Sequence, residues 1–557
     1  MSGRASFELP GRWIYLGLAS FVAILWLATL SSRPLFNPDE GRYAEIPREM
    51  LSSGDWVVPH LNGLAYVEKP PLQYWATALS LQIFGQGEFA ARLYTALCAL
   101  GTLGVVGWVA RELWGSAAAW RAAAVLASLL LFVVLGQLLT LDMSLTFYMT
   151  LALAGFLLAQ RRPHSDKASR AAALERRWML VAWAATGLGV MTKGLEAAVI
   201  PAAVLVLYSV AARDFSPWRR LCLAQGLPVF LVISVPWHVM AARRLPDFLQ
   251  FFFVHEHVSR FLTPSADREE PWWFFAMVLA LGSIPWTLSV LRVLASGWRR
   301  RAPRGQFDAG VFLWVWVVFI CGFFSLSDSK LIPYILPAIP ALALLIAESR
   351  ADVIRRDVGI TAVISLLAAA LLGAASVYAP AHVESAGRNQ YFLLLAKPLI
   401  EIAVLLALSG AIALFQRGRD VTRATVLLGV GWCVAGMLLM RAAAVVAPVY
   451  SGVVLARALG DVGPDVPIYS VGTYDQTLPF YWQRTVKLVA YRGELDFGLR
   501  HDERAQMPSV ARFVEQWNGL SQAYAVMENS MFDDLTSRGV PMREVARDVH
   551  RTLAARR

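Results

Sequence analysis

The sequence predicts an α-helical polytopic membrane protein with about thirteen transmembrane helices, followed by a small soluble α/β domain. Of its 557 residues, 57% are apolar and only 16% are charged, and the mean hydropathy is +0.51. Stretches long enough to cross ~30 Å of hydrocarbon at ~1.5 Å per residue recur along most of the chain. One soluble core does not account for this composition.

The apolar stretches set the predicted domain organisation. They cover residues 13–31, 89–111, 117–137, 139–160, 178–192, 195–212, 221–241, 272–292, 310–326, 331–347, 358–379, 399–415 and 424–447. The fifth is short for a crossing. A membrane domain is therefore predicted over 1–447, and a soluble domain over 448–557.

Lysine and arginine predict the orientation, because cytoplasmic loops retain positive charge during insertion. Alternate loops carry Arg161, Arg162, Lys167, Arg170, Arg176, Arg177, Arg213, Arg219, Arg220, Arg299, Arg300, Arg301, Arg304, Arg350, Arg355, Arg356, Arg417, Arg419 and Arg423. These loops are predicted to be cytoplasmic, which places the first large loop and the C-terminal domain outside. The net charge of +11 is then an insertion signal, and no basic, aromatic-interleaved face indicates a nucleic-acid partner.

The composition changes after Ala447, where hydrophobic runs shorten and turn residues appear. Residues 466–471, 486–491 and 523–527 are predicted strands, and 476–482, 509–518 and 531–537 are predicted helices. Alternating strands and helices favour an α/β layer arrangement. Without a phosphate-binding loop or nucleophile elbow, this domain is expected to be structural or to dock the acceptor.

The first outer loop is predicted to form two surface helices, at about 38–53 and 71–84. Asn37 is a suitable N-cap, Pro38 suits the first helical position, and Glu40 stands where a capping-box acid would lie. Spacing alone thus explains Glu40. Asp39 falls in the first turn, where the helix dipole favours its ionised form.

Further charges are predicted at the same membrane face. Glu68 and Lys69 precede Pro70-Pro71 at the second surface helix, and Asp142, Lys193 and Lys330 stand at the outer ends of later apolar stretches. Each has a structural explanation, such as a cap for Asp142 or a local pair for Glu68. Because ionisable groups at such depth are costly, their convergence indicates one polar cavity.

The segment Phe252-Phe253-Val254-His255-Glu256-His257-Val258-Ser259-Arg260-Phe261 adds a candidate metal site. Imidazole and carboxylate both suit zinc or a similar divalent ion, so His255, ahead of His257, could bind a metal together with Glu68. The His-x-His spacing is also common for surface histidines. Arg260 is predicted to bind an anionic oxygen through its planar guanidinium.

These motifs resemble a known family. Pro38-Asp39-Glu40-Gly41-Arg42-Tyr43, Tyr66-Val67-Glu68-Lys69-Pro70-Pro71-Leu72 and Leu141-Asp142, set in a long multispan chain, are similar to GT-C glycosyltransferases of the protein O-mannosyltransferase superfamily. Within it they look most like the bacterial 4-amino-4-deoxy-L-arabinose transferases that modify lipid A. The chain lacks the Trp-Trp-Asp-Tyr-Gly signature of oligosaccharyltransferases.

The resemblance implies transfer of aminoarabinose from undecaprenyl phosphate to a lipid A phosphate at the periplasmic face of the bacterial inner membrane. It also implies lipopolysaccharide modification, polymyxin resistance and no obligatory protein partner. The implied catalytic acids are Asp39 and Asp142, and the implied metal-associated acid is Glu68, to which the His-x-His segment adds His255 as a predicted metal ligand. The predicted substrate-binding residues are Lys69, Arg42, Tyr43, Tyr66, Arg260, Tyr334, Lys193 and Lys330.

The residues themselves leave two questions open. Asp39 could act as a base for a hydroxyl acceptor, or it could orient an already anionic phosphate or bind the ammonium of the sugar. Another polyprenyl-phosphate-sugar transferase would fit the same motifs. An ion-coupled transporter using Asp142 and Lys193 is a different class, disfavoured because the charges gather at one face and no inverted repeat is evident.

Overall fold

The computed structural model describes residues 9–160, 168–259, 270–297, 299–300, 307–382, 386–460 and 462–557. These residues divide into two units. The first unit joins Met1–Thr29 to Thr95–Ala442, and the second joins Leu30–Tyr94 to Ala443–Arg557. The first outer segment is therefore grouped with the C-terminal residues, although some 350 residues of membrane domain separate them in the sequence.

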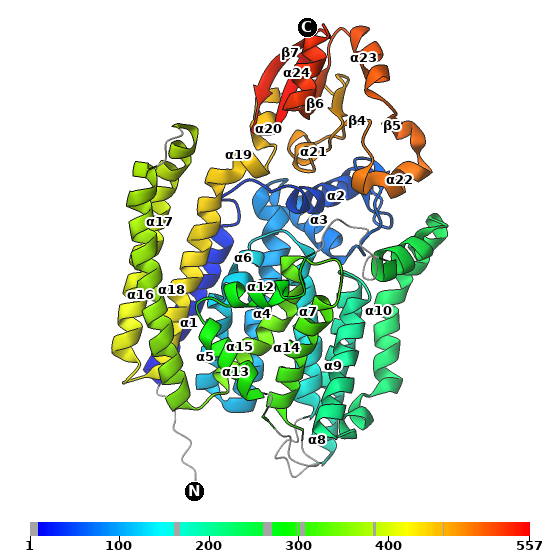
Figure 1. Cartoon of the computed structure of the whole chain (residues 1–557). Helices are drawn as coiled ribbons and strands as arrows, with labels where there is room; N and C mark the ends of the chain where they lie inside the picture. Colours follow the sequence, from blue (N-terminus) through cyan, green and yellow to red (C-terminus); the bar gives the residue numbers. More distant parts are fainter. Residues whose placement is uncertain are drawn as a thin grey trace. The chain divides into compact units, whose positions relative to one another are not determined.

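The first unit is a helical bundle (Figure 1). Its helices are α1 (Leu9–Ala28), most of α4 (Glu88–Trp114), α5 (Ser116–Ser128), α6 (Leu130–Leu135), α7 (Leu141–Gln160), α8 (Ala168–Val190), α9 (Glu196–Ala212), α10 (Leu223–Arg244), α12 (Phe274–Gly282), α13 (Thr287–Gly297), α14 (Ala309–Ser325), α15 (Ile339–Ala347), α16 (Ala351–His382), α17 (Ala386–Gln416) and α18 (Val421–Ala442). Short turns of other helix types are η1 (Ser216–Arg220), the π-helix η2 (Gln250–Ser259) and η3 (Ile332–Ala338). Helix lies on each of the predicted apolar stretches.

Within the described part of the chain, six helices are long and apolar enough to cross a membrane by length and composition. They are Glu88–Trp114, Leu141–Gln160, Leu223–Arg244, Ala351–His382, Gln390–Gln416 and Val421–Tyr450. Shorter apolar helices cover most of the other predicted stretches. The structure thus confirms a polytopic helical fold, while the number of crossings stays a prediction.

Two of the apolar stretches, 117–137 and 272–292, are broken helices whose breaks are joined by hydrogen bonds. The break between α5 and α6 lies at Leu129, which has an extended backbone, and the break between α12 and α13 follows Gly282. The Leu130 amide donates to the Ile284 carbonyl at 3.0 Å, and the Trp286 indole donates to Ser128 Oγ at 2.8 Å. Such mutual bonding lets irregular backbone lie inside a bundle, where water does not reach it.

In the second unit, the first outer segment forms α2 (Asp39–Ser53), the hairpin of β1 (His60–Leu61) and β2 (Leu64–Ala65), and α3 (Leu72–Phe84). Gly54 ends α2 in the left-handed region, at φ 71°, a conformation that glycine adopts without cost. The two helices lie at the predicted positions and pack on each other.

The C-terminal part of this unit is an α/β domain. Its elements are η4 (Ala443–Val446), α19 (Ala447–Tyr450), α20 (Val453–Leu459), β3 (Ile468–Val471), α21 (Thr477–Trp482), β4 (Lys487–Val489), η5 (Gly493–Leu495), α22 (Asp496–His501), η6 (Glu503–Ala505), β5 (Gln506–Met507), α23 (Val510–Asn518), β6 (Tyr524–Glu528), α24 (Asn529–Ser537), β7 (Met542–Arg547) and β8 (Arg551–Arg556). The sheet order is β5-β4-β3-β6-β8-β7. The first four strands in this order are parallel, whereas β8 pairs antiparallel with β6 and β7. The predicted α/β class is confirmed, and the terminal β7-β8 hairpin was not foreseen.

Candidate functional site

Asp39 begins α2 and remains accessible. Its side chain is 48% exposed, and Oδ1 lies 3.4 Å from Nη1 of Arg42, one turn later on the same helix. A carboxylate in the first turn is stabilised by the helix dipole and by this guanidinium. Asp39 therefore offers an accessible anion on a rigid element.

Arg42 links Asp39 to the C-terminal domain. Its other terminal nitrogen, Nη2, lies 2.5 Å from Oε2 of Glu494, and the Arg42 side chain is only 11% exposed. The guanidinium also lies over the rings of Tyr43 and Tyr66, at 5.7 and 5.9 Å from their centroids. The predicted residues Asp39, Arg42, Tyr43 and Tyr66 thus form one cluster, joined by Glu494.

Glu494 is a member of this cluster that the sequence did not reveal. Burial raises its pKa, and the charges of Glu68 and Asp39 add to the increase, while Arg42 and the hydrogen bond from Gln476 act against it. Glu494 lies within the short turn η5, in a domain with evenly mixed charges, so no sequence pattern distinguishes it. Only the fold brings it to Arg42.

Several buried polar groups around Arg42 lack a hydrogen-bond partner among the described residues. They are Arg42 Nε and the hydroxyls of Tyr74 and Tyr474. Tyr74 is fully buried, and its ring lies 6.1 Å from that of Tyr43. Burial raises the pKa of the Tyr74 hydroxyl well above its ordinary value, so this hydroxyl is a neutral donor. Since buried polar groups are normally paired, this arrangement is suited to a polar ligand.

Glu68 and Lys69 lie in the loop that leads to α3, and both are partly buried. The Glu68 carboxylate acts electrostatically on Tyr66, Tyr74 and Glu494. The structure therefore places Glu68 beside the Arg42 cluster, as the sequence suggested. Lys69 is the next residue along the same loop.

Glu40 has a different environment from Asp39. Its carboxylate accepts hydrogen bonds from Arg33 Nη2 at 3.0 Å, Arg92 Nε at 2.7 Å and the Phe36 amide at 2.9 Å. All three charged side chains are at most 3% exposed. Burial alone would raise the pKa of Glu40, but Arg92 and Arg33 hold it well below its ordinary value. The structural interpretation of Glu40 is right, although its buried arginine partners were not foreseen.

Asn37 does not cap α2 with its side chain, contrary to the expectation. The N-cap is Pro38, which forms no side-chain cap bond. Instead, Asn37 Nδ2 donates to Asp475 Oδ2 at 3.1 Å, and Asn37 Oδ1 accepts from the Gln476 amide at 3.2 Å. Asp475 in turn forms an ion pair with Arg551. Asn37 therefore ties the start of α2 to the C-terminal domain, because a long-range partner competes successfully with the local cap.

The first unit holds a second group of predicted residues. Asp142, in the first turn of α7, is 8% exposed, and its Oδ1 lies 2.6 Å from Lys193 Nζ. The Lys193 ammonium also lies 4.8 Å from the centroid of the Tyr334 ring. These three residues come from separate elements and form one site. Lys330 is buried but forms no ion pair with the residues that the structure describes.

The predicted metal site is not assembled within either unit. His255 lies in η2, its side chain is 60% exposed, and its Nδ1 lies 3.4 Å from Glu256 Oε1. Among the residues described, no group of three or more His, Cys, Asp and Glu side chains could hold a metal ion. Arg260 lies outside the described residues. Metal binding by Glu68 and His255 stays a prediction, and no chemical step is derived through it.

Family models match both parts of the chain. Residues 12–252 match the dolichyl-phosphate-mannose-protein mannosyltransferase model, and residues 455–556 match the aminoarabinose transferase C-terminal domain. Together with the helical fold, these matches define a multi-pass membrane glycosyltransferase.

Individual relatives narrow this class. The chain is 38% identical to an undecaprenyl phosphate-alpha-4-amino-4-deoxy-L-arabinose arabinosyl transferase of Sodalis glossinidius, over 68% of this chain and 67% of the relative. The chain is 34% identical to the transferase of the same description from Aeromonas salmonicida, over 61% of this chain and 60% of the relative. The crystal structure of ArnT from Cupriavidus metallidurans bound to undecaprenyl phosphate matches with a TM-score of 0.88 at 33% identity, over 98% of both chains. The chain belongs to the aminoarabinose transferase family.

Proposed function

We propose that this protein transfers 4-amino-4-deoxy-L-arabinose from undecaprenyl phosphate to a phosphate of lipid A. The observation that carries the proposal is the match to ArnT, which extends over 98% of both chains and includes the C-terminal domain. The reaction is assigned to the periplasmic face of the bacterial inner membrane. This location agrees with the arginine-rich loops predicted on the opposite side.

The reaction exchanges one anomeric bond for another. The bond between the anomeric carbon and the undecaprenyl phosphate oxygen breaks, and its electron pair stays on the departing phosphate. A bond then forms between the anomeric carbon and an oxygen of the acceptor phosphate. Cationic side chains suit the departing anion, because they stabilise charge that grows in the transition state. We assign this role to Lys69 and Arg260.

The Arg42 cluster is suited to the sugar. Glu494, Glu68 and Asp39 together present carboxylates to a cationic amino group, and the tyrosine hydroxyls can bond to sugar hydroxyls. An acceptor phosphate is already anionic and needs little deprotonation, so in this proposal Asp39 orients a substrate instead of acting as a base. Asp142 forms an ion pair with Lys193, whose ammonium also lies over the Tyr334 ring, so the charge of this buried carboxylate is compensated.

Mass spectrometry of lipid A tests the proposal directly. Cells that carry the gene are expected to show lipid A with added aminoarabinose, and cells without it are expected to lack the addition. Complementation with Asp142→Asn should not restore it. If lipid A is unchanged and secreted proteins lose mannose, the enzyme is a protein mannosyltransferase instead. If the purified protein turns over no polyprenyl-phosphate donor while Asp39→Asn and Asp142→Asn abolish ion-driven uptake, the protein is a transporter.

The metal prediction is tested separately. We propose that any bound divalent ion depends on Glu68 and His255, so metal analysis of the purified protein should show less ion in Glu68→Gln and in His255→Ala. Equal metal content in these variants and the unmodified protein would remove the metal site without affecting the glycosyl transfer assignment.

A further inference from the structure

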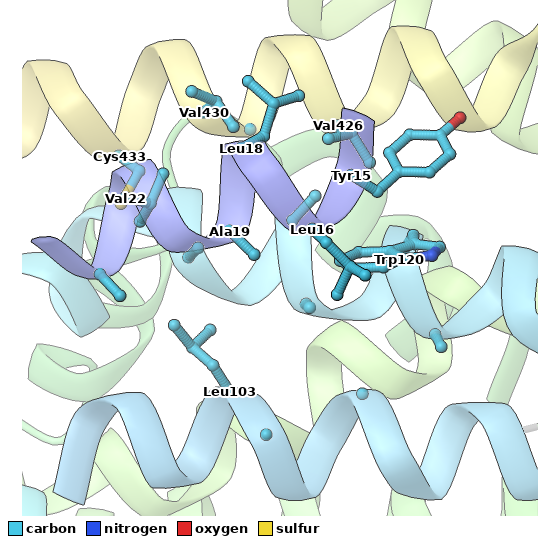
Figure 2. Close-up of a pocket in the computed structure, with 18 of the residues that line it drawn as sticks. Tyr15, Leu16, Leu18, Ala19, Val22, Leu103, Trp120, Val426, Val430 and Cys433 are labelled. Carbon is cyan, nitrogen blue, oxygen red and sulfur yellow. The ribbon is translucent and has the colours of Figure 1, made fainter. Parts of the chain in front are cut away.

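A groove of about 650 Å³ runs between α1, α4, α5 and α18 of the first unit. Apolar side chains such as Leu18, Val22, Leu103 and Val430 line most of its length (Figure 2). Glycine keeps it open, since a Cβ added at Gly104 would meet no atom within 4 Å. The volume lies within the ~300–1,000 Å³ typical of ligand pockets.

The polar side chains of the groove gather at one end. Arg111 lies in the last turn of α4, Ser116 begins α5, and Tyr15 and Trp120 come from the adjoining turns of α1 and α5. The Tyr15 and Trp120 rings stack with centroids 5.2 Å apart. Aromatic pairs of this kind are typical of the interface between hydrocarbon and lipid headgroups.

Arg111 supplies a positive charge at this end of the groove. It is exposed and forms no ion pair with any described residue, although Glu112 follows it in the chain. Asp420 and Arg423 carry opposite charges and both act electrostatically on Tyr15, so together they add no net charge. Arg111 is therefore the cation available to an anionic headgroup here.

We propose that this groove binds one acyl chain of an anionic phospholipid, with the lipid phosphate held by Arg111. The apolar walls match the chain, and the polar end matches the headgroup. An arginine near the membrane surface favours an anionic lipid about fivefold. The site contains none of the residues assigned to glycosyl transfer, so it is a separate lipid site.

Photocrosslinking of the purified full-length protein in nanodiscs tests this assignment. The probe is phosphatidylglycerol with a diazirine in its acyl chain, compared with phosphatidylcholine that carries the same chains. We expect preferential labelling of α1 and α4 by the phosphatidylglycerol probe. Gly104→Leu should fill the groove and lower labelling by about tenfold, a change of ~1.4 kcal/mol. Arg111→Gln leaves the walls intact and should lower the preference about fivefold.

Gly17→Leu is the matched control. Gly17 lies on α1 outside the groove, and a Cβ there would also meet nothing within 4 Å, so labelling should not change. Equal labelling by both probes, or full labelling in Gly104→Leu, would overturn the proposal. Displacement of the label by undecaprenyl phosphate, but not by unlabelled phosphatidylglycerol, would also overturn it and would indicate a site for the donor lipid. Arg111→Gln keeps the test decisive if Gly104→Leu does not fold.

Discussion

Asp39 and Glu40 are neighbours in the first turn of α2, yet their surroundings differ completely. Glu40 lies between two buried arginines and accepts a backbone hydrogen bond as well. Asp39 is half exposed beside Arg42, in a region where buried hydroxyls lack partners. A fully satisfied polar network stabilises the fold, whereas a partly satisfied one is suited to a ligand. Two acids with the same local sequence context therefore lie in different environments.

The largest expected effect is a loss of stability when Glu40 is replaced. Glu40→Ala leaves Arg33 and Arg92 buried without their anion, and breaking a buried ion pair in this way typically costs ~3–5 kcal/mol. The thermal unfolding midpoint of the detergent-solubilised protein should fall sharply. Asp39→Asn is the matched control, because an exposed side chain changes stability by only ~0.5 kcal/mol. Equal loss of stability in both variants would remove the distinction between the two acids.

The next largest effect is a loss of activity when Asp39 is replaced. Asp39→Asn removes the accessible carboxylate and should lower turnover of the undecaprenyl-phosphate-linked donor by about a hundredfold, or ~2.7 kcal/mol. The measurement is kcat with purified protein at saturating donor. Turnover within twofold of the unmodified enzyme would assign Asp39 to structure rather than to the reaction.

A smaller effect is expected where α2 is tied to the C-terminal domain. Asp475→Asn keeps the shape of the side chain but removes the charge paired with Arg551, whose pKa burial lowers to about 10. Hydrogen bonds to charged groups contribute ~1.5–3 kcal/mol, so a loss of about 2 kcal/mol in the free energy of unfolding is expected. Asn37→Ala should lose less, since only one of its two hydrogen bonds, the one to Asp475, involves a charged group. A larger loss in Asn37→Ala would place the main tie elsewhere.

The smallest effect concerns acid pH. The pKa of Glu40 is lower in the folded protein than its ordinary value of 4.5, so its network contributes full stability above that value. This contribution is lost as the pH falls below 4.5 toward the folded pKa, at up to ~1.4 kcal/mol per pH unit. The free energies of unfolding of the unmodified protein and of Glu40→Gln should therefore differ by a constant amount near neutral pH. This difference should shrink as the pH falls into the acid range. A constant difference throughout would show that Glu40 is not the titrating group.

The broken helices show where local patterns stop being informative. Hydropathy predicted single crossings at 117–137 and 272–292. Gly282 and Pro285 favour a break in the second stretch, whereas the sequence around Leu129 gives no such sign. The interruptions are stable because Leu130 bonds to Ile284 and Trp286 bonds to Ser128. Each break supplies hydrogen-bond partners for groups at the other, which lowers the cost of irregular backbone inside the bundle. No single stretch of sequence contains this relationship.

The sequence by itself determined the elements. Hydrophobic length predicted the helices of the bundle, short apolar runs between turn residues predicted β3, β4 and β6, and the motifs around Asp39, Glu68 and Asp142 predicted polar groups. These features depend on neighbouring residues, so they are readable locally. Only the tertiary structure decided that Glu494 pairs with Arg42, that Glu40 is enclosed by Arg33 and Arg92, and that Asn37 binds Asp475. Charge pairs carry no periodicity, and two of these link residues more than 400 positions apart, so their partners follow from the fold alone.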